Sequence, residues 1–351
     1  MLAVRLSLAV GSAALSSLLT YVIWRVALSR GILDVPNERS SHQVPTPRGG
    51  GLAIVLVATA GFSYLALVGV VDNSLFAALM GGVAVALVGF IDDRRALSPG
   101  VRLAAHLGAA LWALAWLGGL PALRFGAHLV PLGAGGLIIG VLGIVWVLNL
   151  FNFMDGIDGL AASEATFIAW CGALLTALAG GPGAVVAAAV VLGAACAGFL
   201  CWNWPPARIF MGDVGSGYIG YVVAVLALAA ARNGPAALWV WLILGGVFFV
   251  DATVTLVRRV ARGESFHDAH RSHAYQWLAR RWRSHRRVTT TTLVLNLLWL
   301  LPGAAFAASR PERASWLVVL ALTPLVVLAL AAGAGRRERP ESSTAMHAPR
   351  E

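Results

Sequence analysis

The chain has 351 residues, of which 59% are hydrophobic and only 12% are charged, and its mean hydropathy is +0.79. This composition excludes an ordinary soluble domain, and several uncharged stretches of about 20 residues are long enough to cross the hydrocarbon core of a bilayer. The net charge of +10 comes from 26 arginines without a lysine, which suits loops beside a membrane better than a nucleic-acid surface.

Apolar segments predict an all-α fold, a polytopic transmembrane helical bundle of about 11 spans, in a single domain over residues 1–334. The first segment, 3–24, is predicted to be a transmembrane helix rather than a signal peptide, because no small-x-small cleavage site leads into a soluble domain. The others are predicted at 51–71, 74–91, 102–119, 132–151, 160–180, 183–202, 214–231, 235–256, 289–309 and 314–334. Residues 335–351 lack apolar periodicity and are predicted to form a disordered tail.

The arginines indicate which side of the membrane each loop occupies. An N-terminus outside the cytoplasm places 21 of the 26 arginines on one face, in alternate loops and the tail. By the positive-inside rule this face is cytoplasmic, so we expect a periplasmic N-terminus and a cytoplasmic C-terminus. The same face receives the unusual polar segments, which lie at 29–50, 92–102, 149–160, 203–217 and 257–288.

Two adjacent carboxylates, Asp92 and Asp93, end the third predicted span. Charges just inside the hydrocarbon boundary are costly unless they are paired, bound to metal or open to water. The pair is therefore either an interfacial pair neutralised by Arg94 and Arg95, or a metal ligand and general base.

Amide and carboxylate side chains recur at a spacing of three residues in the segment 149–160, at Asn149, Asn152, Asp155 and Asp158. On one helix these four would share a face, which suits a hydrated cation and a diphosphate. Capping of the helix predicted from about residue 160 is the simpler explanation. It accounts for one aspartate but not for the whole stripe.

Asp213 stands in the segment MGDVGSG, at the mouth of the eighth predicted span. It either caps that helix or holds a Mg²⁺–phosphate complex near the helix N-terminus. The glycines at 215–220 match G-x-G-x-x-G, but no strand precedes them, so a dinucleotide-binding fold is excluded.

Histidine and arginine side chains recur in the last and first polar segments, at His267, His270, Arg271 and His273, and at Arg39, His42 and Arg48. Zinc would need a cysteine or carboxylate to complete a tetrahedral site. Phosphate binding by these donors and a solvated basic loop near acidic lipid heads are the remaining interpretations.

Two acidic residues fall inside predicted spans, and they support an alternative function. In a secondary transporter, Glu164 and Asp251 would be the coupling residues. Transporters concentrate polar groups near the midplane and often have two matching halves, whereas this chain has its polar groups at one surface. We expect Glu164 to snorkel to the interface, and Asp251 to pair with Arg258 or with the polar site.

Five motifs together resemble the polyprenyl-phosphate sugar-1-phosphate transferases of glycosyltransferase family 4, in the family's order over roughly 31–285. They are D-x-P-N-x-R-S-S-H at 34–42, the Asp92–Asp93 pair, N-x-x-N-x-x-D-G-I-D-G-L at 149–160, I-F-M-G-D-x-G-S at 209–216 and H-R-S-H-A-Y-Q at 270–276. Five motifs in order are strong support where each alone would be moderate.

The resemblance implies a Mg²⁺-dependent reaction, with Mn²⁺ as a substitute, of a UDP-sugar with undecaprenyl phosphate at the bacterial inner membrane. Asp213, with Asp155, would bind the metal, and Asp92 or Asp93 would deprotonate or position the lipid phosphate. Asn152, Asp155 and Asp158 would position the nucleotide and diphosphate. The loop that contains His267, His270, Arg271 and His273, called the histidine loop below, would contact the diphosphate or the sugar. The expected partners are the two substrates and membrane lipid, with a homodimer as one candidate assembly.

Some positions depart from the family pattern. The acidic motif usually has Asp or Lys at its fifth position, where this chain has Ala96. Spaced histidines and the absence of lysine disfavour the muramoyl-pentapeptide branch. The H-R-S-H-A-Y-Q motif is similar to the lipopolysaccharide and O-antigen branch, whose donors are UDP-N-acetylhexosamines.

Overall fold

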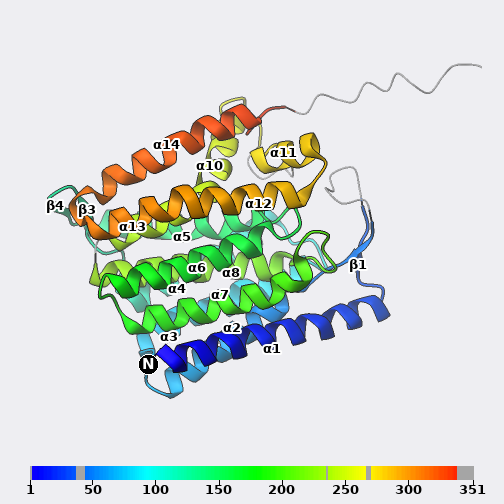
Figure 1. Ribbon diagram of the computed structural model, residues 1–351, viewed down its shortest axis with the longest axis horizontal. Helices are drawn as coiled ribbons and strands as arrows, with labels where there is room; N and C mark the ends of the chain where they lie inside the picture. Colours follow the sequence, from blue (N-terminus) through cyan, green and yellow to red (C-terminus); the bar gives the residue numbers. More distant parts are fainter. Residues whose placement is uncertain (1, 37–43, 235, 266–269, 338–351) are drawn as a thin grey trace, which may run out of the picture.

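The computed structural model describes residues 2–36, 44–234, 236–265 and 270–337. Within them, helices run side by side along the long axis of the molecule (Figure 1). A short antiparallel pair of strands, β1 (Leu33–Asp34) and β2 (Thr46–Pro47), and helix α11 (Ala274–Trp282) lie at one end. The hairpin of β3 (Leu123–Phe125) and β4 (His128–Val130) lies at the other end.

The predicted all-α polytopic bundle is confirmed. In the described part of the chain, 9 helical segments are long and apolar enough to cross a membrane. They are α1 (Leu2–Ser29), α3 (Asn73–Asp92), α4 (Pro99–Leu117), α5 (Gly133–Phe153), α6 (Leu160–Leu178), α7 (Gly183–Asn203), α8 (Asp213–Asn233), the stretch α12 (His285–Leu295), η1 (Asn296–Leu300) and α13 (Leu301–Ser309), and α14 (Ala314–Ala332) preceded by η2 (Pro311–Arg313).

Two of the eleven predicted spans correspond to helices of a different kind. The helix α2 (Gly51–Leu67) has only 17 residues. The predicted span 235–256 is a pair of helices, α9 (Ala237–Leu244) and α10 (Gly246–Val260), bent by 74°. The count of candidate spans is therefore 9, or 10 if the bent pair is one span.

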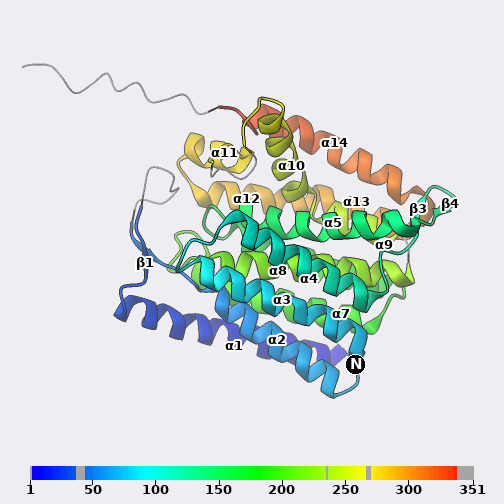
Figure 2. The ribbon, with the colours of Figure 1, turned by 180° about the vertical axis from the view of Figure 1, so that it is seen from behind.

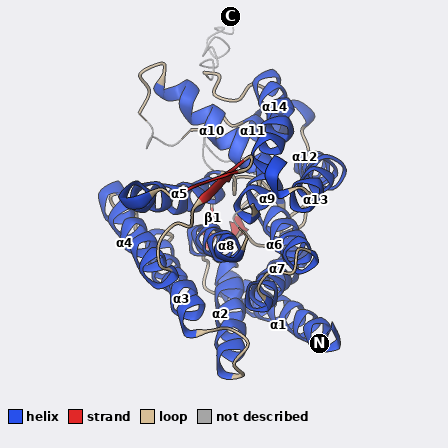
Figure 3. Ribbon diagram, turned by 90° about the vertical axis from the view of Figure 1, so that its left-hand side faces the viewer, coloured by secondary structure: helices blue, strands red, loops and turns tan. Residues whose placement is uncertain are grey.

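Helix α8 occupies the centre of the bundle, as the end-on view in Figure 3 shows. Its most apolar window is 100% buried, whereas the corresponding windows of α1 and α4 are mostly exposed. Small residues allow this close packing. A Cβ added at Gly220 would stand 2.8 Å from the Leu148 Cα of α5, and one at Gly89 of α3 would stand 2.4 Å from the Asp213 carbonyl oxygen. The first close approach holds α8 against α5, and the second holds the beginning of α8 directly beside the end of α3.

The predicted exposure of Glu164 is wrong. Its side chain is 0% exposed, and its carboxylate accepts a hydrogen bond of 2.5 Å from the Asn296 amide of the π-helical turn η1. A carboxylate in the second turn of α6 cannot reach the interface when α12 and η1 cover it. The residue thus belongs to the packed interior.

Candidate active site

All five predicted polar segments meet at the end of the bundle that holds β1 and α11. Phe210 donates its N–H to the Pro47 carbonyl (2.8 Å), which joins the 203–217 segment to the first loop. The Tyr275 hydroxyl donates to the Phe153 carbonyl (2.9 Å), which joins the histidine loop to the end of α5. Loops distant in sequence thus form one surface.

Asp93 holds the amino end of α8. Its two carboxylate oxygens accept the backbone N–H groups of Asp213 (3.1 Å) and Val214 (3.2 Å), and Arg48 donates to its carbonyl oxygen. Burial raises the pKa of the Asp93 carboxyl above its usual value, although the two backbone hydrogen bonds oppose that shift. Arg48, predicted to bind substrate, therefore contacts the peptide that follows the carboxylate pair.

The neighbouring Asp92 has different partners. One oxygen accepts the Leu97 N–H (2.6 Å), and the other forms an ion pair of 3.0 Å with Arg102 of α4. Ser98 and Pro99 begin α4 as N-cap and first residue, so the chain turns back within a few residues and carries Arg102 over the carboxylate. The two carboxylates of the predicted pair thus have different partners: Asp93 contacts the start of α8, and Asp92 contacts Leu97 and Arg102.

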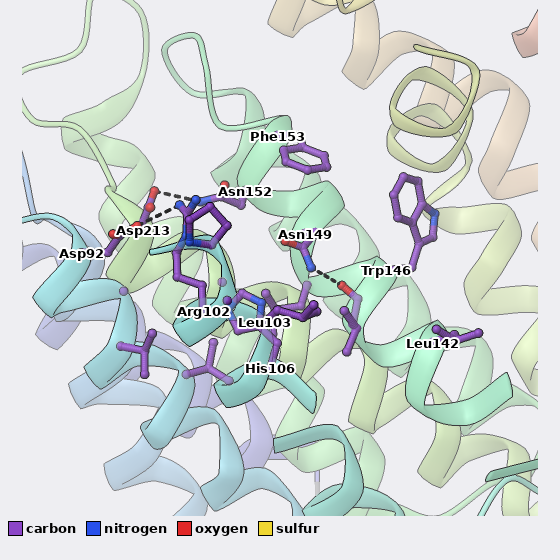
Figure 4. A pocket seen from close by; sticks show the side chains of 18 of the residues that line it. Asp92, Arg102, Leu103, His106, Leu142, Trp146, Asn149, Asn152, Phe153 and Asp213 are labelled. Carbon is purple, nitrogen blue, oxygen red and sulfur yellow. Dashed lines mark hydrogen bonds and ion pairs between the residues drawn. The ribbon is translucent and has the colours of Figure 1, made fainter. Parts of the chain in front are cut away.

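Asp213 is the first residue of α8, and an amide from α5 contacts it. The Asn152 side chain donates to the Asp213 carboxylate (2.8 Å) and to the Ser216 hydroxyl (3.2 Å). Asn149, one turn earlier on α5, donates to the Val145 carbonyl (2.7 Å). The spacing of the two asparagines along α5 thus places both on the side that faces the site, as Figure 4 shows.

The predicted stripe of four polar residues ends after its second member, because α5 ends at Phe153 and α6 begins only at Leu160. Asp155 lies in the turn between them. Burial raises the pKa of its carboxyl well above the usual range, and the negative charge of Asp213 is the largest of three acidic neighbours that raise it further. Gly159, not an aspartate, is the N-cap of α6.

Asp158 is bound to protein groups on the far side of this turn. Its carboxylate accepts the Ala207 N–H (3.1 Å) and lies 3.2 Å from the His285 Nδ1 atom. Its carbonyl oxygen accepts the Thr289 hydroxyl (2.9 Å). These bonds join the turn to the 203–217 segment and to α12, so Asp158 holds the turn in place.

The histidine loop is held by Asp251 of α10. The Asp251 carboxylate accepts the N–H groups of Ala274 (2.8 Å) and Tyr275 (3.0 Å) and lies 3.4 Å from the His273 Nδ1 atom. Asp251 therefore holds the start of α11. Its predicted pairing with the polar site is confirmed through His273. Burial lowers the pKa of His270 to about 3, so this imidazole is neutral near pH 7.

The residues that follow α14 pack against this loop. Arg258 donates to the Ala334 carbonyl (2.5 Å), Arg262 donates to that of Gly335, and the Gly335 N–H donates to the Ser272 carbonyl (2.7 Å). The Ser272 hydroxyl in turn lies 3.0 Å from the His270 Nδ1 atom. We call residues 333–337 the C-terminal clamp.

Of the predicted tail, 338–351 lies outside the described residues, as do His267, Arg39 and His42. The fourth predicted residue of the histidine loop, Arg271, is described, and its carbonyl accepts a hydrogen bond from Arg280 (2.8 Å).

A cavity of about 420 Å³ opens beside Asp92 and Asp213. Figure 2 shows α3, α4 and α5 side by side, and the cavity is lined by these helices and the start of α8. Its polar end holds Asp92, Arg102, Asn149, Asn152 and Asp213, as Figure 4 shows. Its walls are apolar and include Val85, Leu103, Leu142, Trp146 and Leu148. The cavity thus combines a charged head with a hydrocarbon-like body.

Arg102 and His106, neither of which is among the predicted site residues, both line this cavity from α4. Their spacing of four residues, just after a Ser-Pro helix start, is the signal that places them on one face.

The carboxylates at this end fit a hard divalent cation. The described residues contain no group of three or more His, Cys, Asp or Glu with metal-site geometry. Mg²⁺, however, is usually held by one or two carboxylates and completes its shell with water and substrate phosphates. Asp213 with Asp155 and the Asn152 amide supplies such oxygen donors, and a cation would relieve the repulsion that raises the Asp155 pKa.

Comparisons with known proteins identify the family of this chain. The model of the family described as glycosyl transferase family 4 matches residues 75–231. A probable undecaprenyl-phosphate N-acetylglucosaminyl 1-phosphate transferase of Bacillus subtilis (strain 168) is 30% identical over 320 residues, which cover 89% of this chain and 85% of the relative.

Two further relatives have related names. The decaprenyl-phosphate N-acetylglucosaminephosphotransferase of Mycobacterium tuberculosis (strain ATCC 25618 / H37Rv) is 32% identical over 81% of this chain and 77% of its own length. The phospho-N-acetylmuramoyl-pentapeptide-transferase of Acaryochloris marina (strain MBIC 11017) is 34% identical over 59% of this chain and 58% of its own length. The chain therefore belongs to glycosyl transferase family 4 and is a multi-pass membrane protein of the polyprenyl-phosphate sugar-1-phosphate transferases.

Proposed function

We propose that this protein transfers an N-acetylhexosamine-1-phosphate from a UDP-sugar to undecaprenyl phosphate and releases UMP. The observation that carries the proposal is the cavity, whose polar head lies beside Asp92 and Asp213 and whose walls are apolar. A lipid phosphate has the same division into a charged head and a hydrocarbon body. The relatives named for undecaprenyl and decaprenyl phosphate support this choice of acceptor.

The reaction is a phosphoryl transfer. An oxygen of the lipid phosphate attacks the phosphorus that carries the sugar, a new P–O bond forms, and the P–O bond to the leaving UMP breaks. The protein's contribution to such a reaction is mainly positioning and charge stabilisation. Direct attack requires fewer steps than a covalent aspartyl-phosphate.

Each polar residue has a proposed role in that reaction. Asp213, with Asp155 and Asn152, would hold Mg²⁺, which would neutralise the donor's diphosphate. Asp92 would position the lipid phosphate or take its proton, since it lies at the cavity's polar end. Asp93 would keep the first turn of α8 in place through its two backbone hydrogen bonds.

The histidine loop is proposed to bind the donor. Its neutral His270 and the capped start of α11 lie beside the turn that carries Asp155, since Tyr275 bonds to Phe153. The H-R-S-H-A-Y-Q motif favours a donor of the UDP-N-acetylhexosamine class. The step would then be the first membrane reaction of O-antigen or another envelope polysaccharide, at the cytoplasmic face of the bacterial inner membrane.

The transporter alternative receives less support. Both carboxylates that it would use have partners within the protein: Asp251 binds the start of α11, and Glu164 binds Asn296. A coupling carboxylate would have to exchange its partners during each transport cycle.

The test is an assay of the purified protein with Mg²⁺, undecaprenyl phosphate and a panel of UDP-sugars, in which UMP is measured. We expect UMP together with a lipid-linked sugar diphosphate from at least one UDP-N-acetylhexosamine. If no donor yields UMP while a substrate crosses proteoliposomes, the protein is a transporter and the proposal is wrong.

A further inference from the structure

The ion pair between Arg102 and Asp92 lies at the polar end of the cavity. Among the described residues that line the cavity, Arg102 is the only one with a permanent positive charge. Its side chain is 37% exposed, whereas that of Asp92 is 8% exposed. Figure 4 shows the guanidinium reaching from α4 toward Asp92 and Asp213.

An entering phosphate would meet two carboxylates here. A phosphate monoester carries roughly −1.5 to −2 charges near pH 7, and the Asp92 and Asp213 carboxylates would repel it. Guanidinium groups bind phosphate oxygens with two parallel hydrogen bonds and keep their charge at any physiological pH. Arg102 is therefore the group in this cavity best suited to attract the phosphate.

A phosphate that takes two parallel hydrogen bonds from this guanidinium through its Nη atoms would compete with Asp92 for Nη1. This Nη1 atom donates to one Asp92 oxygen at 3.0 Å, while the other Asp92 oxygen is held by the Leu97 N–H at 2.6 Å. If Arg102 turned to a phosphate, Asp92 would remain tethered through Leu97 but would expose its freed oxygen to the cavity. The arrangement thus allows a phosphate to take the place of Asp92 on the Arg102 guanidinium.

We propose that Arg102 binds the phosphate of the lipid acceptor, and that this phosphate replaces Asp92 on the guanidinium. The ion pair is the resting arrangement of the site. Acceptor binding frees Asp92 beside Asp213, so the reacting carboxylate becomes available only when the acceptor is present. The inference rests on the proposed function in one respect, namely that the acceptor is a lipid phosphate.

Binding measurements without any donor test this exchange. Farnesyl phosphate is the probe and farnesol its neutral control, and the variants are Arg102→Gln and Arg102→Lys. The matched control is Arg95→Gln, an exposed arginine of the loop before α4 that does not line the cavity. We expect Arg102→Gln to weaken farnesyl phosphate binding by roughly 10- to 100-fold, as for lost hydrogen bonds to a charged group.

The other outcomes separate an exchange from a structural ion pair. Farnesol binding and the KM for the UDP-sugar should stay unchanged in Arg102→Gln, and Arg102→Lys should recover part of the phosphate affinity. Asp92→Asn should bind farnesyl phosphate more tightly than the wild type although it turns over more slowly. If Asp92→Asn and Arg102→Gln both weaken phosphate binding equally, the pair is only structural and the inference is wrong.

Failure of the inference can be told apart from failure of the proposed function. Normal UMP release with an unchanged acceptor KM in Arg102→Gln would refute the role of Arg102 and leave the function intact. Arg102-dependent binding of farnesyl phosphate without UMP from any donor would refute the function and leave the binding site intact.

Discussion

Four aspartates lie close together at the end of the bundle that holds β1 and α11, which we call the reactive end, but their surroundings differ. Asp213 meets an amide, Asp93 meets two backbone N–H groups, Asp92 meets Arg102, and the described residues give the Asp155 carboxylate no hydrogen-bond donor. Sequence reasoning could name these residues because clustered carboxylates at a membrane surface are unusual. It could not divide their roles, because the partners come from α4, α5 and α8.

The rate should be most sensitive to Asp213 and Asp92. Changing either to Asn removes one negative charge next to the reacting phosphates and keeps the shape, so we expect kcat to fall at least about 10²-fold. Release of UMP under saturating substrates measures the effect. Glu312→Gln, an exposed change at the other end of the bundle, serves as the control. Near-normal rates in both aspartate variants would refute the assignment of the site.

Asp93 should affect stability more than its neighbours do. Asp93→Ala leaves two N–H groups at the start of α8 without an acceptor, which costs roughly 1–3 kcal/mol for each buried group left unpaired. We expect a clearly lower melting temperature for Asp93→Ala, whereas Asp213→Asn should melt near the wild-type temperature. Equal melting temperatures for the two variants would show that Asp93 does not hold the helix.

Chelation should abolish the reaction if oxygen donors of Asp213 and Asp155 hold the metal. We expect no UMP in excess EDTA and full recovery with Mg²⁺, with Mn²⁺ as a weaker or equal substitute. Asp213→Asn should require more Mg²⁺ for half-maximal rate than the wild type, because one charged ligand is lost. Activity that persists in EDTA would remove the metal from the mechanism.

At the scale of elements, the C-terminal clamp links the last helix to the histidine loop. Gly335 has a φ of +68°, and a Cβ there would stand 2.8 Å from the Arg258 Cβ, so glycine permits the close approach. Glu264 pairs with Arg262, Arg259 and Arg337, and their hydrogen bonds lower the pKa of its carboxyl to about 2. A lowered carboxyl pKa stabilises the clamp above pH 4.5 or so, and this support is lost as the pH falls toward 2.

Truncation tests the clamp. A chain that ends after residue 332 loses the bonds to Arg258 and Ser272, and we expect its kcat to fall roughly 10-fold because His270 loses the support of Ser272. A chain that ends after residue 337 keeps these bonds and is the matched control. Equal rates for the two truncated proteins would show that the clamp does not position the histidine loop.

The elements also show how far sequence patterns reach. Apolar runs predicted most helices to within a few residues because the thickness of a bilayer determines their length. The bend at Gly245 and the π-helical turn at Asn296 depend on packing against other helices, and no local pattern marks them. For the same reason the predicted stripe from Asn149 to Asp158 failed, since α5 ends at Phe153.

For the whole molecule, the arginine distribution predicts that the reactive end faces the cytoplasm. In a cysteine-free version of the protein, a single cysteine at Arg95 should be labelled by a membrane-impermeant reagent only in inverted vesicles. A cysteine at Ala127, in the turn of the β3–β4 hairpin, should be labelled only from the periplasmic side. The reverse pattern would contradict the predicted orientation.

The burial of α8 separates the chemistry of this protein from the lipid around it. Transfer from a bilayer to a detergent micelle replaces the surroundings of α1, α4 and α14, whose surfaces are largely exposed, but not those of α8, whose window is 100% buried. The position of Asp213 should therefore survive extraction. If activity is lost in micelles, we expect the cause to be detergent tails that compete with the acceptor for the apolar walls of the cavity. Added long-chain acceptor should then restore the activity.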